Sequence, residues 1–236
     1  MKIGKKSFFV FLFFCFFVII SIAGYYFWYV NYNNTVSSDI NPLDLLVFEI
    51  KFDNLTDFQK EKAFERFNKA KNIILKNESE ENEEAKNNAN FSSWLAIAIV
   101  QKSIGDYERA AKIWIWFTDI HSGNSISPAN LGDLYKSFVV DNEKSEKYYK
   151  IAIAREKEDW QIYYGFYELY RYNFQDPEKA ISVLKDGAKN NPDDINYIYE
   201  LSDYLISLNR QAEAEKIIEE YISRHPESAS LRNKLK

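Results

Sequence analysis

The sequence has little of the residue types on which catalytic and metal sites depend. Its 236 residues include one cysteine and two histidines. Cys15 lies in an apolar run, so the rest of the chain can form neither an internal disulfide nor a thiolate metal site. His121 and His225 each follow a segment with helical periodicity, where a histidine is favourable at a helix carboxyl end without any catalytic role. We therefore expect no enzyme activity, no metal and no cofactor.

Glycine, proline and excess charge are also scarce. The seven glycines and five prolines are too few for an all-β chain and suit helices joined by short loops. The 30 basic and 35 acidic residues give a net charge of -5, which creates no field that would attract nucleic acid. No phosphate-binding glycine loop or nucleophile motif is present, so a small-molecule substrate is not expected. The composition predicts an all-α chain that binds no nucleic acid.

The uncharged segment 8–30 has the length and flanking charges of a membrane-spanning helix. At about 1.5 Å per residue it reaches about 34 Å, more than the roughly 30 Å hydrocarbon core. Three lysines precede it and the next charge is Asp39, so residues 1–7 should stay cytoplasmic and the later residues should be periplasmic or extracellular. A cleaved signal peptide is the alternative, because residues 21–23 have the small-residue spacing of a cleavage site, and the protein would then be secreted.

A repeat of 34 residues is visible in the second half of the chain. Three residues recur at this interval: Ala180, Leu184 and Pro192 return as Ala214, Ile218 and Pro226. Further upstream, a unit counted from Phe91 has residues typical of repeat positions 4, 7, 8, 15, 17, 20 and 24, namely Trp94, Ile97, Ala98, Gly105, Tyr107, Ala110 and Trp114. This pattern resembles the tetratricopeptide repeat (TPR) family. The resemblance implies an α-solenoid of helical hairpins, each made of a helix A and a helix B.

The resemblance also implies where small residues should lie. Because helices A and B cross closely, positions 8 and 20 should be small and their neighbours large. Ala98 and Ala110 meet this requirement in the first unit, and Ser202 and Ala214 meet it in the last unit, counted from Ile195. We therefore expect all four side chains to be buried at helix crossings.

The residues expected in loops agree with this division. Asp106 and Asn209 are placed to cap second helices, Pro177 suits a first helical turn, and Pro192 and Pro226 follow expected helix ends. These positions predict short loops between the helices of each hairpin.

The middle of the array departs from the 34-residue period. A second unit has Leu131 and Gly132 at positions 7 and 8, but its second helix fits only after one inserted residue near 140–142. The third unit, counted back from Ala180, begins at Gln161 and places Glu168 at position 8, where a small residue is expected. With these departures, residues 91–228 predict about three and a half to four hairpins.

The segments on either side of the repeats have simpler signals. Thr56 and Gln59 form a capping-box pattern that predicts a helix to about Lys76. The rest of segment 56–90 is acidic without an apolar face, which indicates a solvated linker or a frayed helix. Residues 31–55 are interpreted as a tether, and residues 229–236 as a tail.

The family resemblance implies a concave groove that binds a protein or peptide, lined by positions 2, 5, 9 and 12 of each helix A. On this chain we assign to the groove Leu95, Ile99, Lys102, Asp133, Lys136, Leu169, Tyr172, Tyr199, Asp203 and Ile206. The alternative for each is packing between adjacent hairpins. We expect the tyrosines to anchor a partner and Lys102 and Lys136 to steer its acidic groups.

Anchor and repeats together predict a non-catalytic, membrane-anchored TPR scaffold at the cell envelope. A self-assembling structural subunit of an envelope complex is the alternative.

Overall fold

The structure is a computed structural model that describes residues 41–79 and 81–235. The regular secondary structure of these residues is entirely helical, as expected. The chain divides into two compact units at Leu45, and the first is described only by the 3-10 turn η1, Pro42–Leu45. Residues 1–7 and the expected span 8–30 lie outside the described residues. None of the described helices is both long and apolar enough to cross a bilayer.

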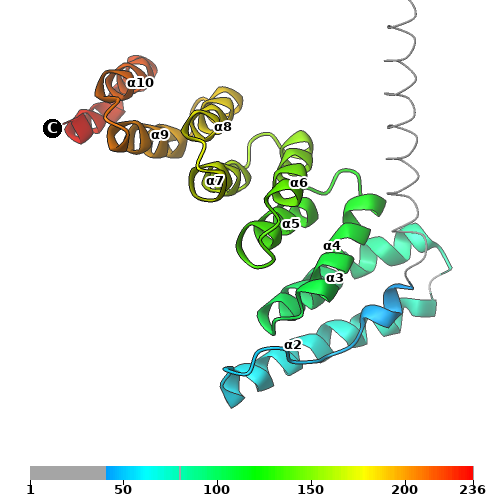
Figure 1. The fold of residues 1–236 in the computed structure, drawn as a ribbon. Helices are drawn as coiled ribbons and strands as arrows, with labels where there is room; N and C mark the ends of the chain where they lie inside the picture. The colour runs from blue at the N-terminus through cyan, green and yellow to red at the C-terminus, as the bar shows by residue number, and fades with distance from the viewer. Residues whose placement is uncertain (1–40, 80, 236) are drawn as a thin grey trace, which may run out of the picture. The chain divides into compact units, whose positions relative to one another are not determined.

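The second unit is a row of helices in which each helix packs against the next (Figure 1). Helix α2, Asp57–Lys76, comes first and is followed by the 3-10 turn η2, Asn77–Ser79. The described residues then form four hairpins: α3 (Glu83–Ser103) with α4 (Tyr107–Ile120), α5 (Ile126–Ser137) with α6 (Asn142–Arg155), α7 (Trp160–Glu168) and its π-helical continuation η3 (Leu169–Phe174) with α8 (Pro177–Asn190), and α9 (Ile195–Ser207) with α10 (Gln211–Arg224). The 3-10 segment η4, Pro226–Leu235, packs on α10 and α9.

The small residues lie where the expected crossings require them. Ala98, Ala110, Ser202 and Ala214 have no exposed surface. In the second hairpin the buried Ser145 hydroxyl donates to a backbone carbonyl of α5 at 2.8 Å, which joins the two helices at their crossing. The two helices of these hairpins therefore pack closely at the positions where the repeat has small residues.

The inserted residue of the second unit lies in a loop. The connection between α5 and α6, residues 138–141, is one residue longer than residues 104–106 between α3 and α4. Val140 in this loop has a φ of 55°, a conformation that a β-branched residue rarely adopts. This confirms the expected position of the insertion.

The predicted start of the third unit was wrong by one residue. Helix α7 begins at Trp160, and the Asp159 side chain caps it by accepting from the Gln161 amide at 2.8 Å. Counted from Trp160, the buried positions coincide with those of α9 counted from Ile195. Position 8 is therefore the fully buried Tyr167. The extra residue lies in η3, because a π-helix accommodates one more residue per turn than an α-helix.

The expected cap of the last helix was also wrong. Asn209 has a left-handed backbone with φ 60°, and the N-cap position of α10 is Arg210, which makes no capping hydrogen bond with its side chain. The other loop residues behave as expected: Asp106 caps α4 by accepting from the Arg109 amide at 3.2 Å, and Pro177 is the first residue of α8.

The helix after the capping box is confirmed. Thr56 Oγ1 accepts from the Gln59 amide at 3.2 Å, and Gln59 Oε1 accepts from the Thr56 amide at 2.9 Å. The acidic segment after it differs from the expected linker, because α3 starts at Glu83 and is capped by Asn82, whose side chain accepts from the Ala85 amide at 3.0 Å.

Residues 46–52 differ from the expected tether. They run in extended conformation beside α2 and the end of α3, where the Lys51 and Phe52 amides donate to the Ile104 carbonyl at 2.8 and 3.1 Å. Gln101 Nε2 donates to the Val47 carbonyl at 2.5 Å. The apolar side chains of this segment give the reason: the Phe48 ring, for example, meets that of Phe67 edge to face at 5.3 Å.

Candidate protein-binding surface

The first helices of the hairpins carry the residues expected to bind a partner. We call α3, α5, α7 with η3, and α9 the A helices. Charged and aromatic side chains of the last three, together with η4, form three groups of contacts, one after another along the chain, which we call the A-helix surface. It comprises Asp133, Lys136, Glu168, Arg171, Tyr172, Tyr199, Glu200, Asp203 and Lys234.

Lys136 holds the second and third hairpins together. Its ammonium nitrogen lies 2.8 Å from Glu168 and 3.4 Å from Asp133, and 5.8 Å from the ring centroid of Tyr149. Only 12% of the side chain is exposed. Lys136 therefore cannot act as the solvated steering lysine that we expected, because carboxylates of its own chain already neutralise it.

Arg171 makes the corresponding link between the third and fourth hairpins. Its guanidinium lies 3.3 Å from Glu200 and donates to the Tyr167 hydroxyl. It also lies over the rings of Tyr204 and Tyr172, at 4.7 and 4.9 Å from their centroids. Burial and then Glu200 raise the pKa of Tyr167 well above its usual range, so this hydroxyl stays neutral.

At the last hairpin the cation comes from η4. The Lys234 ammonium pairs with Asp203 and lies 4.6 Å from the ring centroid of Tyr199. Tyr199 and Asp203 are four residues apart on α9, so their side chains lie on one helix face. Two residues assigned to the groove thus form one site, and it holds a lysine.

Exposure separates the assigned groove residues into three groups. Tyr172 and Tyr199 are 57% and 40% exposed, which leaves two large aromatic side chains accessible on the A-helix surface. Asp203 is also exposed, whereas Asp133 and Ile206 are partly buried. Leu169 was wrongly assigned to the groove: it has no exposed surface, because the one-residue register error placed a core position on the groove side. The same error gave Tyr172 the twelfth position, which Arg171 occupies.

The assigned residues of the first hairpin lie apart from the others. Ile99 is exposed and Leu95 is partly buried. The Lys102 ammonium lies over the rings of Trp114 and Phe138, at 5.9 and 5.5 Å from their centroids. Phe138 follows α5, so Lys102 reaches the second hairpin through an aromatic ring. No ion pair of Lys102 is recorded within the described part of the chain.

The buried Tyr149 side chain contacts two residues of the A-helix surface, Asp133 and Lys136. It lies against both Gly132 of α5 and Gly165 of α7: a Cβ added to Gly132 would lie 2.8 Å from the ring, and one added to Gly165 would lie 2.6 Å from the hydroxyl oxygen. Its hydroxyl donates to Asp133. Burial and then the Asp133 carboxylate raise its pKa far above the usual range. The two glycines therefore serve to admit the ring that fixes Asp133 in place.

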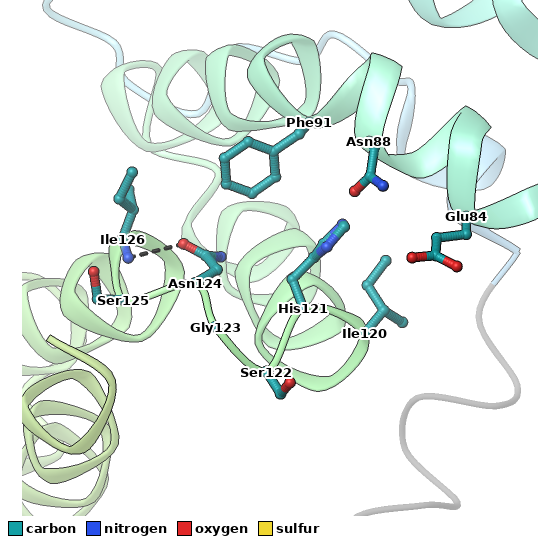
Figure 2. A pocket seen from close by; sticks show the side chains of 10 residues that line it. All are labelled: Glu84, Asn88, Phe91, Ile120, His121, Ser122, Gly123, Asn124, Ser125 and Ile126. Atoms are coloured by element: carbon teal, nitrogen blue, oxygen red, sulfur yellow. Dashed lines mark hydrogen bonds between the residues drawn. The ribbon is translucent and has the colours of Figure 1, made fainter.

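A separate pocket of about 580 Å³ lies where α3 passes the α4–α5 loop (Figure 2). Figure 2 shows the His121 side chain below Asn88 and Phe91. The His121 ring stacks on Phe117 at 5.2 Å and meets the Phe91 ring edge-on at 5.4 Å. Burial lowers the pKa of His121, and Glu84 opposes this effect. Sequence reasoning missed the pocket because one wall comes from the segment interpreted as a linker.

The loop that forms the other wall is fixed by Arg155 of α6. Its guanidinium donates to the carbonyl oxygens of Thr118 and Asn124, both at 2.9 Å, and of His121 at 3.3 Å. The Asn124 side chain accepts from the Ile126 amide at 2.9 Å (Figure 2). One partly buried cation therefore satisfies carbonyl groups at the end of α4 and in the loop.

The described hairpins define the class of the protein. Their lengths, their small residues at helix crossings and their sequential packing make it a TPR-like helical-repeat protein. Residues 133–235 match the family model described as Suppressor of forked protein (Suf), which covers less than half of the chain.

The solved structures that match this chain include the following two. "Crystal structure of MamA" has a TM-score of 0.47 at 16% sequence identity and covers 75% of this chain and 99% of that chain. "MamA RS-1 ArsTM double mutant" has a TM-score of 0.46 at 13% identity and covers 73% of this chain and 96% of that chain. No curated protein matches the chain.

Proposed function

We propose that this protein is a non-catalytic scaffold that binds a segment of another protein on its A-helix surface. The observation that carries the proposal is the exposure of Tyr172 and Tyr199 on a surface whose neighbouring charges are already paired. Tyrosine is enriched among the residues that dominate binding energy. A tyrosine on a fixed helix face loses little conformational freedom on binding, which favours affinity.

We further propose that residues 8–30 hold the scaffold in a membrane, with the repeats on the periplasmic or extracellular side. This part rests on sequence alone: the length of the uncharged segment and the three lysines before it. Protease added outside intact cells, or to spheroplasts, should digest the repeats. Repeats that stay intact until the membrane is opened would place them on the cytoplasmic side.

Site-specific crosslinking tests the binding surface. A photoreactive residue at Tyr172 or Tyr199, in the full chain in its native membrane, should give an adduct with a partner protein. The same residue at Glu215, on the exposed surface of α10, is the matched control and should give none. Adducts at Glu215 alone would show that the partner uses the second helices, and adducts between copies of this chain would favour a self-assembling subunit.

Affinity measurements should then rank the residues. Tyr199→Ala should weaken partner binding by roughly 1 to 3 kcal/mol, since truncation of an aromatic anchor removes most of its contact area. Lys102→Ala should mainly slow association at low salt. Full affinity in Tyr199→Ala together with loss in Glu215→Ala would refute the assignment of the surface.

A further inference from the structure

The twelfth position of the A helices carries a cation in three hairpins and an apolar residue in the fourth. In chain order it is occupied by Lys102, Lys136, Arg171 and Ile206. Each cation lies over at least one aromatic ring. Lys136 also pairs with one carboxylate of its own hairpin and one of the next, and Arg171 pairs with a carboxylate of the next hairpin. The fourth hairpin has the ring and the carboxylate, Tyr199 and Asp203, but no cation on its own A helix.

This missing cation is supplied by η4. Lys234 places its ammonium over the Tyr199 ring and against Asp203. A ring face and a carboxylate on one side of a helix attract a cation by two independent electrostatic effects. The pair Tyr199–Asp203 is therefore a cation-binding site that is completed by a segment from outside the hairpin.

Side chains hold η4 at this site. Leu231 is 1% exposed and packs in the cluster with Ile198, Ile218, Tyr221 and Ile222. Arg232 forms two hydrogen bonds to Glu219, at 2.6 and 2.5 Å, and Gln211 Nε2 donates to the Leu235 carbonyl at 2.9 Å. The Arg232 and Glu219 side chains are 49% and 44% exposed, but their pair is bidentate, a geometry in which a partly exposed ion pair still contributes. Leucine burial, this pair and the Lys234 site are thus the main attachments.

We propose that this end of the A-helix surface selects a basic, leucine-containing protein segment, and that residues 231–235 occupy it in the unbound protein. The inference rests on the proposed function and specifies its partner. The observed occupant defines the chemistry: a leucine side chain enters the apolar cluster, and three residues later a lysine reaches Tyr199 and Asp203. A partner segment with this spacing displaces the chain's own segment.

Self-occupancy has a consequence for affinity. Residues 231–235 are part of the same chain as their binding site, so their effective concentration at the site is high. A separate peptide therefore binds weakly unless the contacts of residues 231–235 are weakened. Weakening them with Leu231→Ala and Lys234→Ala leaves the receiving residues Tyr199 and Asp203 unchanged. These two substitutions should therefore increase affinity for a free segment.

The probe is a fluorescein-labelled peptide with the sequence of residues 226–235, titrated by fluorescence anisotropy against the full chain in detergent. Binding to the Leu231→Ala/Lys234→Ala variant should be about tenfold tighter than to the unchanged chain, because competition from residues 231–235 is lost. Adding Asp203→Asn to this variant should weaken binding about tenfold. A peptide with glutamate in place of its lysine is the matched control and should not bind. If the Leu231→Ala/Lys234→Ala variant has a clearly lower melting temperature than the unchanged chain, the Lys234→Ala variant is used alone.

The results separate this inference from the proposed function. Equal binding of the lysine and glutamate peptides, or binding unaffected by Asp203→Asn, would overturn the selection of a basic segment. Failure of the double variant to gain affinity would overturn self-occupancy. In either case crosslinking through Tyr172 would still stand as support for the scaffold. Loss of that crosslinking with normal peptide binding would instead count against the scaffold function.

Discussion

The close approach of Tyr149 to two glycines gives a specific test of the packing described above. In Gly132→Ala the new Cβ would lie 2.8 Å from Cδ1 of Tyr149 and 2.9 Å from Cγ and Cε1. The Tyr149 residue is 1% exposed, and its hydroxyl oxygen would lie 2.6 Å from a Cβ added to Gly165. Because the ring is buried and in contact with two helices, it has little room to move away from an added Cβ.

Two opposing effects set the magnitude. Overpacking of a closed site costs about 1 to 3 kcal/mol. Replacing a mid-helix glycine with alanine returns roughly 0.5 to 1 kcal/mol of backbone entropy and helix propensity. We expect Gly132→Ala to lower the free energy of unfolding by about 0.5 to 2 kcal/mol. Gly123→Ala is the control, since nothing lies within 4 Å of its added Cβ.

Urea unfolding followed by far-ultraviolet circular dichroism measures the difference. Repeating both substitutions, Gly132→Ala and Gly165→Ala, in a Tyr149→Phe background gives a second comparison. This change removes the hydroxyl that is closest to the added Cβ in Gly165→Ala, but it keeps the ring atoms that are closest to the added Cβ in Gly132→Ala. The cost of Gly165→Ala should fall in the phenylalanine background, while that of Gly132→Ala should persist. A Gly132→Ala protein as stable as the unchanged protein would refute the close approach of α5 and α6.

Three further outcomes are expected. Ala214→Leu should destabilise the last hairpin by about 1 to 3 kcal/mol, whereas Ala212→Leu, at an exposed position of the same helix, should leave the urea midpoint unchanged; equal midpoints would mean that the repeat register is wrong. Arg155→Gln should speed hydrogen exchange in the α4–α5 loop, since it removes three bonds to backbone carbonyls; unchanged exchange rates would show that the loop is stable without it. Because burial lowers the pKa of His121 below its unfolded value, its contribution to stability is complete above that unfolded value and is lost as pH falls toward the folded one. His121→Gln should reduce the loss of melting temperature at acidic pH. If the variant and the unchanged protein lose melting temperature equally as pH falls, His121 is not the source of the acid sensitivity.

The repeat was predictable from the sequence because its determinants are local. A small residue at a helix crossing and a capping carboxylate act within one hairpin, so Ala98, Ala110 and Asp106 could be found by matching one stretch of sequence to the family pattern. The insertion near Val140 could be placed for the same reason, since a loop absorbs an added residue without moving the helices on either side.

The third hairpin shows why spacing was insufficient elsewhere. Its extra residue lies inside the helical segment η3. Repeat positions counted back from Ala180 pass through η3, so every position assigned to the A helix of this hairpin was wrong by one residue. Leu169 was assigned to the groove through this shift. The signal that could have prevented the error is Asp159, a capping residue directly before Trp160.

Long-range pairing was the other part that sequence reasoning could not supply. The periodicity places Lys136 on the partner side of helix A, but its neutralisation by Glu168 depends on how the second hairpin stacks on the third. The same holds for Lys234 and Asp203, which are 31 residues apart. The family pattern thus assigned charges such as Lys136 to helix A, but it could not identify the residues that pair with them.

The extended segment 46–52 determines where a mechanical load would enter the repeats. Tension on the chain before Leu46 would act on hydrogen bonds that join this segment to Lys71, Gln101 and the Ile104 carbonyl. The load would pass to α2 at one point and to the end of α3 at two others, instead of unwinding α2 from its first turn. Tension would therefore enter the array through bonds to two helices and not through the first turn of α2 alone.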